Sequence, residues 1–177
     1  MTRGDSLSRS SAEGFQLVNK DAVVSLWNER FGIPEKVFER ISFFRRGRMI
    51  WAFSLPEIPP FRCESVGMRV ISMRESPWKP TTYALQLWGR YARKNVIDLD
   101  DEMARRFFAG ESLELRAPVE RGYVVVTHMG SVIGCGLYTP GRLISQLPRE
   151  RRILEIEDQP ACQDNTHPGD AHHEGAE

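Results

Sequence analysis

Apolar residues near the N-terminus follow a helical period. Val23, Leu26 and Trp27 have the i, i+3, i+4 spacing of a helix with one buried face. Asn19 can accept hydrogen bonds from the first N–H groups, and Gly32 can take the positive φ that often ends a helix. The pattern therefore predicts a helix between these two residues.

The spacing of apolar residues then changes to one that is typical of β-strands. Apolar, aromatic-rich runs at 41–44 and 49–53 flank the basic segment 45–48, which predicts a hairpin with a basic tip. A further strand is expected over 66–73. Together these elements predict a small N-terminal α/β domain over residues 14–78.

The middle of the chain predicts a helix, a strand and a second helix. Residues 81–92 place Ala84, Leu85 and Trp88 on one side, with cationic residues expected at the helix end. Residues 95–99 form a short apolar strand, and the next helix is expected to run from Asp100, its N-cap, to Gly110.

From residue 114 onward the pattern is that of closely spaced strands. The unbroken apolar run 123–127 indicates a strand covered on both faces, as in a small closed barrel. Gly130–Ser131 predicts a two-residue hairpin loop, and Pro140–Gly141 predicts a type II turn. Gly134 and Gly136 share one face of the intervening strand, where they indicate either a structural bend or a ligand-facing surface.

The charge of the chain is unevenly distributed. The net charge is zero, but seven of the 24 acidic residues lie in 155–177, where there is no Lys or Arg. The remainder therefore carries 24 basic and 17 acidic residues, about seven positive charges in excess. Of the basic residues 20 are Arg, whose planar fork suits phosphate contacts, so a polyanion is a plausible partner. Arg-rich composition alone is equally compatible with a solvated surface.

The terminal segments 1–13 and 155–177 lack periodic apolar residues, and we expect both to be disordered. No run of eighteen apolar residues predicts a membrane span, and the polar first eleven residues lack the apolar middle of a secretion signal. Cys63, Cys135 and Cys162 are odd in number and widely spaced, which favours a reducing, cytoplasmic location.

The sequence shows no convincing catalytic or metal centre. Cys135 and His128 lie on neighbouring predicted strands, but a buried thiol near an unrelated His is the simpler interpretation. The acidic residues 100–102 are explained by helix capping. Possible metal ligands fall in the predicted disordered tail, where fixed geometry is improbable: Cys162, His167, His172 and His173. We therefore expect no enzymatic activity, no metal and no cofactor.

Several spaced elements resemble a PUA domain, with the closest similarity to the PUA-like C-terminal region of Sun-family RNA cytosine-5 methyltransferases. The resemblance covers roughly residues 79–152, within a predicted PUA-like domain of residues 79–154. It is carried by Lys79–Arg90, Asn95–Leu113, Gly122–Val126, Gly134–Leu137, Gly141–Leu143, Leu147–Pro148 and Arg151. It implies an α+β fold in which a small N-terminal α/β domain precedes a PUA-like β-pseudobarrel.

The same resemblance implies binding of structured RNA, either rRNA or tRNA. The methyltransferase domain of that family has no counterpart here, since neither a Gly-rich cofactor loop nor a Pro-Cys motif is found. Ile144–Ser145 also stands where the family often has a Lys-Asn pair, which removes one expected basic contact. The implied function is non-catalytic RNA binding in rRNA or tRNA modification or in ribosome biogenesis.

Basic residues beside the predicted barrel are the expected RNA contacts, mainly to phosphates. They are Lys79, Arg90, Arg93, Lys94, Arg142, Arg149, Arg151 and Arg152. An adaptor that targets a separate RNA methyltransferase or ribosome-assembly protein is the alternative. In that case Phe43, Phe44 or Trp78 would form an exposed aromatic patch, although single aromatic residues more often belong to a core.

Overall fold

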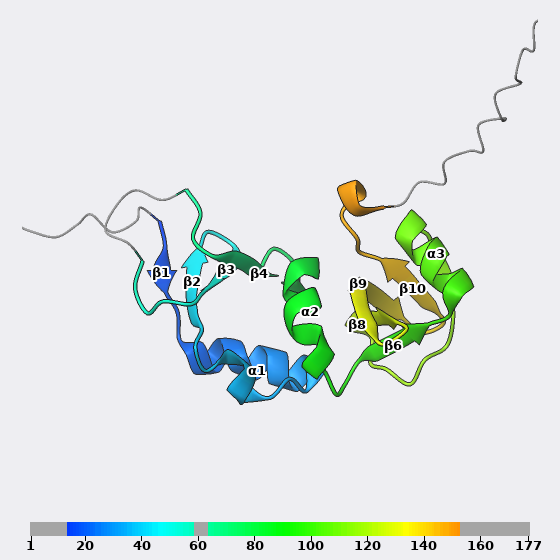
Figure 1. The fold of residues 1–177 in the computed structure, drawn as a ribbon, viewed down its shortest axis with the longest axis horizontal. Coiled ribbons are helices and arrows are strands. Elements are labelled where there is room, and N and C mark those ends of the chain that lie inside the picture. Colours follow the sequence, from blue (N-terminus) through cyan, green and yellow to red (C-terminus); the bar gives the residue numbers. More distant parts are fainter. Residues whose placement is uncertain (1–13, 59–63, 153–177) are drawn as a thin grey trace, which may run out of the picture.

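A computed structural model describes residues 14–58 and 64–152, and it has two five-stranded sheets with three α-helices and three short 3-10 turns in those ranges (Figure 1). The predicted tails 1–13 and 155–177 lie outside the described residues, as do Cys63 and the four candidate ligands of the acidic tail. The expected α+β class is confirmed. Within the described ranges, no helix is long and apolar enough to cross a membrane.

The first sheet is antiparallel throughout, in the order β1-β2-β3-β4-β5. The helix α1, Lys20–Phe31, begins after the N-cap Asn19 and ends at Gly32, whose φ is 64°, as predicted. A 3-10 turn over Glu35–Phe38 leads into the predicted hairpin. The strands are β1 Gln16–Leu17, β2 Ser42–Arg46, β3 Met49–Phe53, β4 Met68–Ser72 and β5 Lys79–Pro80.

The second sheet has the order β6-β8-β9-β10-β7, with β6 parallel to β8 and all other pairs antiparallel. The crossover from β6 includes α3, Asp101–Ala109, which begins after Asp100 and ends at Gly110 as predicted. The strands are β6 Val96–Leu99, β7 Ser112–Glu114, β8 Gly122–His128, β9 Ser131–Thr139 and β10 Arg142–Ser145.

One predicted turn is shifted by one residue. His128 pairs with Ser131, so the loop between β8 and β9 is Met129–Gly130, not Gly130–Ser131. Both loop residues have positive φ, 50° and 75°, the requirement of the type I′ turn that joins twisted strands. Pro140–Gly141 does join β9 to β10 as predicted, and Gly141 has the positive φ of 87° that a type II turn needs.

A continuous core connects the two sheets. The helix α2, Thr82–Trp88, lies between them (Figure 1) and buries Ala84, Leu85 and Trp88 against both. Trp27 of α1 is fully buried, and its ring centroid is 5.2 Å from that of Trp88. The same cluster contains Val125 of β8 and Cys135 of β9. The domain boundary between residues 78 and 79 stays a prediction. The buried side chains of α2 lie in the same cluster as those of α1, on the other side of that boundary.

The two glycines of β9 are explained by side-chain packing. A Cβ on Gly134 would lie 2.6 Å from Leu147, and one on Gly136 would lie 2.5 Å from the fully buried Leu143. Both positions are thus filled by the core of the second sheet, and no ligand surface lies over them. Of the two interpretations of these glycines, the structural one therefore applies, and the ligand-facing surface does not.

Candidate nucleic-acid interface

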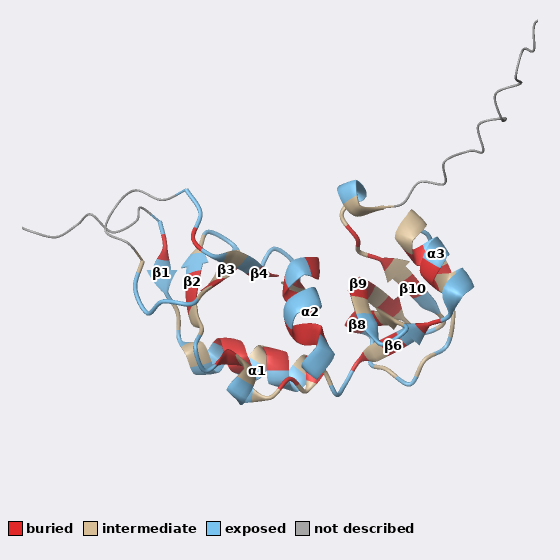
Figure 2. Ribbon diagram, viewed as in Figure 1, coloured by how far each residue is buried: buried red, intermediate tan, exposed pale blue. Residues whose placement is uncertain are grey.

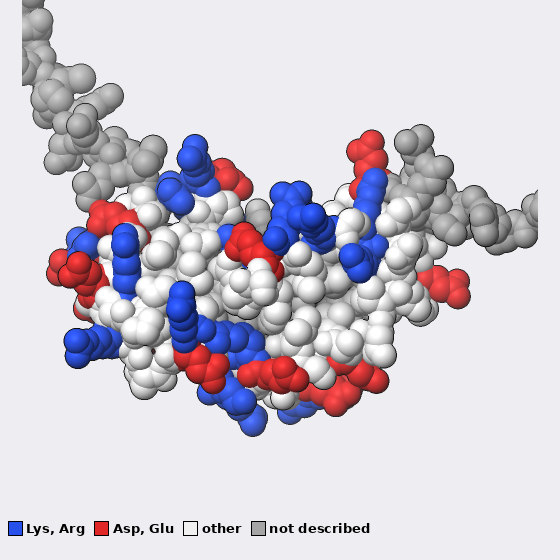
Figure 3. Space-filling view, turned by 180° about the vertical axis from the view of Figure 1, so that it is seen from behind, with Lys and Arg blue, Asp and Glu red and all other residues white. Residues whose placement is uncertain are grey.

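An open groove of about 1020 Å³ separates the edge of the first sheet from the segment that follows β10. Arg69, Arg74 and Lys79 line it from the first sheet, and Arg149 and Arg152 line it from the second half. Figure 3 shows basic side chains on both sides of a hollow in the upper edge of the molecule, with acidic side chains next to them. The acidic residues that line the groove are Glu75 and Glu150. Basic residues therefore outnumber acidic ones in the groove.

Lys79 is a half-buried residue of the groove lining and is held in place from two sides. Its Nζ donates to Oε1 of Gln146 at 2.7 Å and lies 5.8 Å from the ring centroid of Tyr123. Tyr123 in turn donates to the carboxylate of Glu75. The pKa of Tyr123 is raised, mainly because the hydroxyl is partly buried and also because of this carboxylate. Among the described residues Gln146 is the single hydrogen-bond acceptor of Lys79, so two of its three N–H donors can face a ligand.

The other side of the groove is formed by a short 3-10 turn, Arg149–Arg151, that begins after Pro148. Arg149 is exposed. Arg152 donates from Nε to the carbonyl of Leu147 at 3.3 Å. Arg151 does not line the groove itself. It donates to Gln86 and lies over the ring of Tyr83, which is at the border of the groove.

The eight residues predicted to contact RNA therefore do not form a single patch. Lys79, Arg149 and Arg152 line the groove. Arg142 lies at the start of β10, where it donates to Ser112, and Arg90 stacks on Tyr91. Sequence reasoning missed Arg69 and Arg74, because nothing in a strand pattern shows which exposed cation will face a groove formed by a distant segment.

Arg93 and Lys94 have a local structural role. The predicted helix 81–92 ends at Trp88 and continues as a 3-10 turn, so these residues do not cap it. Instead their backbone N–H groups donate to the carbonyl of Phe31, at 2.8 and 3.0 Å, which places them at the C-terminal end of α1. Cations are favourable there because of the helix dipole.

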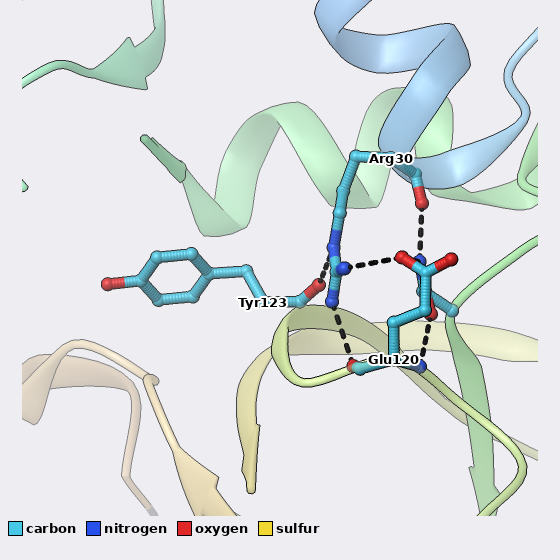
Figure 4. A network of polar contacts seen from close by, with 4 residues as sticks. Arg30, Glu120 and Tyr123 are labelled. Atoms are coloured by element: carbon cyan, nitrogen blue, oxygen red, sulfur yellow. Dashed lines mark hydrogen bonds and ion pairs between the residues drawn. The ribbon is translucent and has the colours of Figure 1, made fainter. Parts of the chain in front are cut away.

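A polar network between α1 and the second sheet fixes the two sides of the groove relative to one another (Figure 4). Arg30 donates to the carbonyl of Tyr123 at 2.9 Å and, in two further bonds of 3.0 Å, to the carbonyl and the carboxylate of Glu120. Asn95 donates to the carbonyl of Arg30 at 2.7 Å and accepts from the N–H of Glu120 at 2.9 Å. Burial lowers the pKa of Arg30, and Glu120 opposes that shift.

Replacing Arg30 with alanine is expected to lower the free energy of unfolding by about 2 kcal/mol, because the partly buried guanidinium loses three hydrogen bonds, one of them to the carbonyl of the buried Tyr123. Urea denaturation followed by circular dichroism measures this. The matched control is Arg106→Ala, which removes an exposed ion pair with Glu111 and is expected to cost about 0.5 kcal/mol or less. Equal losses in the two variants would contradict the assigned role.

The weak catalytic candidates are not brought together. Cys135 pairs with Val125 and is buried, and burial raises its pKa to about 12. His128 lies at the far end of the same strand pair and contacts the Leu99 carbonyl and Asp101 instead. In the described part of the chain, no group of three His, Cys, Asp or Glu side chains could hold a metal ion.

The aromatic patch considered for an adaptor is also absent from the described surface. Phe43 and Phe44 are buried, at 0% and 4% exposure, and Trp78 packs 5.3 Å from Trp27. Phe43 and Phe44 belong to buried clusters and Trp78 packs against one of them, so these residues do not form an exposed patch and have the core role that single aromatic residues more often have.

Comparison with known proteins gives matches to both halves. Residues 94–153 match a family model described as the methyltransferase RsmF PUA domain, and residues 8–67 match a family of unknown function (DUF7122). The ribosomal RNA small subunit methyltransferase F of Vibrio atlanticus is 26% identical over 108 residues, which are 59% of this chain and 23% of the relative. The protein of the same name from Psychromonas ingrahamii is 26% identical over 115 residues, 60% of this chain and 24% of the relative.

These matches confirm the predicted resemblance to the PUA-like region of RNA methyltransferases. The second sheet with α3 is therefore a PUA-like pseudobarrel, and it supplies the Arg149 side of the groove. The chain spans about a quarter of the length of the curated relatives that it matches.

Proposed function

We propose that this protein, in which residues 94–153 form a PUA-like region, binds structured RNA and acts without catalysis in rRNA or tRNA modification or in ribosome biogenesis. The observation that supports this proposal most strongly is the groove, in which cations from two sides face a common space. Guanidinium groups on both sides can contact phosphates of two backbone segments at once. This arrangement favours a folded RNA over an isolated strand.

Recognition would depend on shape more than on sequence. The charged side chains that line the groove are mainly Arg and Lys, which bind phosphates and fix the orientation of the RNA. Base-specific contacts are made chiefly in unpaired segments, where base edges and faces are accessible. The expected ligand of the groove is therefore a hairpin or junction of rRNA or tRNA.

The first experiment is a fluorescence anisotropy titration of the full chain with labelled rRNA and tRNA hairpins. If about four phosphates are contacted, affinity should fall about 10²-fold between 50 and 200 mM salt, because each contact releases counterions. Double-stranded DNA of equal length serves as the control and is expected to bind more weakly. Absence of binding to any hairpin at 50 mM salt would contradict the proposal.

The second candidate is an adaptor for a separate RNA methyltransferase or ribosome-assembly protein. It is supported by the match of residues 94–153 to a family model described as a methyltransferase PUA domain, and by relatives whose names state methyltransferase activity. Affinity purification after nuclease treatment tests it. A partner retained in stoichiometric amounts would support the adaptor, and loss of all partners on nuclease treatment would contradict it.

A further inference from the structure

The outward face of α2 and the following 3-10 turn, Gly89–Tyr91, carries three large residues that the core does not use. Tyr83, Leu87 and Tyr91 are spaced four residues apart and are 49%, 51% and 38% exposed. We refer to these three residues as the aromatic stripe. The opposite side of the helix is buried (Figure 2). Contiguous exposed apolar side chains of this kind mark interaction sites more often than isolated ones do.

Each ring of the aromatic stripe is paired with an arginine. The guanidinium of Arg151 lies 4.1 Å from the centroid of Tyr83, and that of Arg90 lies 4.7 Å from the centroid of Tyr91. Hydrogen bonds of 2.7 Å to Gln86 and to the Tyr91 hydroxyl orient these two arginines. The rings and the guanidinium planes are thus held in place before any ligand binds, which lowers the entropic cost of binding.

The chemistry of this surface suits nucleobases and phosphates together. Aromatic rings and guanidinium planes both stack on bases, and the two arginines complement a polyanion. Neither arginine has a carboxylate partner among the described residues, so both charges are available. An apolar peptide would gain little from the arginines, since Leu87 is the only aliphatic member of the stripe.

The aromatic stripe is also continuous with the groove. Tyr83 lines the groove and is the first residue of the stripe, and Arg149 and Arg151 of the same 3-10 turn face the groove and the stripe respectively. Tyr83 and Tyr91 are eight residues apart, about 12 Å along a helix axis, which is too far for one base to contact both rings. A strand that leaves the groove would therefore place at least two unpaired bases on α2.

We infer that the aromatic stripe binds a single-stranded RNA segment adjoining the folded RNA in the groove, by stacking of bases on Tyr83 and Tyr91. This inference rests on the proposed function, because the groove must hold the folded part. It extends that function by naming a second contact surface outside the PUA-like match and the chemical class of its ligand.

The test compares two probes on the full chain by anisotropy: an RNA hairpin with a blunt end, and the same hairpin with a six-nucleotide single-stranded extension. The wild-type chain should bind the extended probe at least tenfold more tightly. Tyr91→Ala, outside the groove, should lose about 5- to 100-fold for the extended probe, the range for removing one stacking ring, and change the blunt probe less than twofold. Tyr83→Ala removes a ring that also lines the groove, so its affinity for the blunt probe can fall as well, but its preference for the extended probe should be reduced by the same 5- to 100-fold. Tyr83→Phe and Tyr91→Phe should keep the wild-type preference, because the ring remains.

The outcomes separate the two proposals. Binding of neither probe by the wild-type chain would overturn the groove and the stripe together. Tight binding of both probes with equal affinity would overturn the stripe alone, and so would alanine variants that keep the preference for the extension. Leu17→Ala, at an exposed position on β1, is the control and should leave both affinities unchanged. If the alanine variants change only self-association in light scattering, the stripe is a contact between copies and the inference is wrong.

Discussion

Replacing Trp27 with alanine is expected to lower the free energy of unfolding by about 3–5 kcal/mol, the range for truncating a large buried aromatic residue. Trp27 is fully buried, and its ring centroid lies within 6.3 Å of those of Phe31, Phe38, Trp78 and Trp88. Its Nε1 has no hydrogen-bond partner among the described residues, so the loss comes from packing and cavity formation. This is the largest effect that we expect from a single substitution.

The same substitution tests whether the two sheets unfold together. The cluster around Trp27 includes Val125 and Cys135 of the second sheet, so loss of this core should weaken both halves in one transition. Tryptophan fluorescence reports on the first sheet and α2, where Trp51, Trp78 and Trp88 lie, and amide exchange of Val124–Val126 reports on the second sheet. We expect the two probes to give coincident urea midpoints in the variant.

Trp27→Phe provides the graded control, because it keeps an aromatic ring in the core. It should lower the free energy of unfolding by about half as much as the alanine variant does. A variant in which the fluorescence midpoint falls while Val124–Val126 stay protected would show two independent units. That result would support a boundary between α2 and β6 in place of a shared core.

The elements best predicted from the sequence are those set by local chemistry. Asn19 and Asp100 accept hydrogen bonds from the first N–H groups of their helices, and Gly32 and Gly110 end the same helices with positive φ. Each of these interactions joins residues that are only a few positions apart in the sequence. The shift of the hairpin loop to Met129–Gly130 shows the limit of this approach. A methionine at positive φ is uncommon, so strand pairing, not residue preference, determines that turn.

The interface could be predicted only in part, because it depends on contacts between distant segments. Lys79 and Arg149 are 70 positions apart in sequence, and their common groove follows from the docking of the two sheets. That docking depends on Arg30 and Glu120, a pair separated by 90 positions with no motif of its own. The sequence identifies the basic residues near the barrel, and their role as RNA contacts stays a prediction. Their division between the groove, the α2 face and the end of α1 could be seen only in the fold.

Reversing the charge of one arginine on each side of the groove, Arg74→Glu with Arg149→Glu, is expected to weaken binding of an RNA hairpin about 10²-fold at 50 mM salt. Both side chains are exposed, and neither makes a side-chain hydrogen bond or ion pair with a described residue, so the fold should be unaffected. Removal of two phosphate contacts should also reduce the slope of log affinity against log salt by about two. Anisotropy titrations at four salt concentrations give both quantities.

The matched control reverses two arginines outside the groove, Arg93→Glu with Arg142→Glu, and changes the net charge by the same amount. Arg93 lies at the end of α1, and Arg142 lies beside Ser112 at the start of β10. If the positive excess attracts RNA only by long-range steering, the two double variants should lose affinity equally. If phosphates sit in the groove, the control should lose less than about fivefold and keep the wild-type salt slope, because it removes no direct contact. Equal losses with unchanged slopes would therefore exclude the groove as the RNA site.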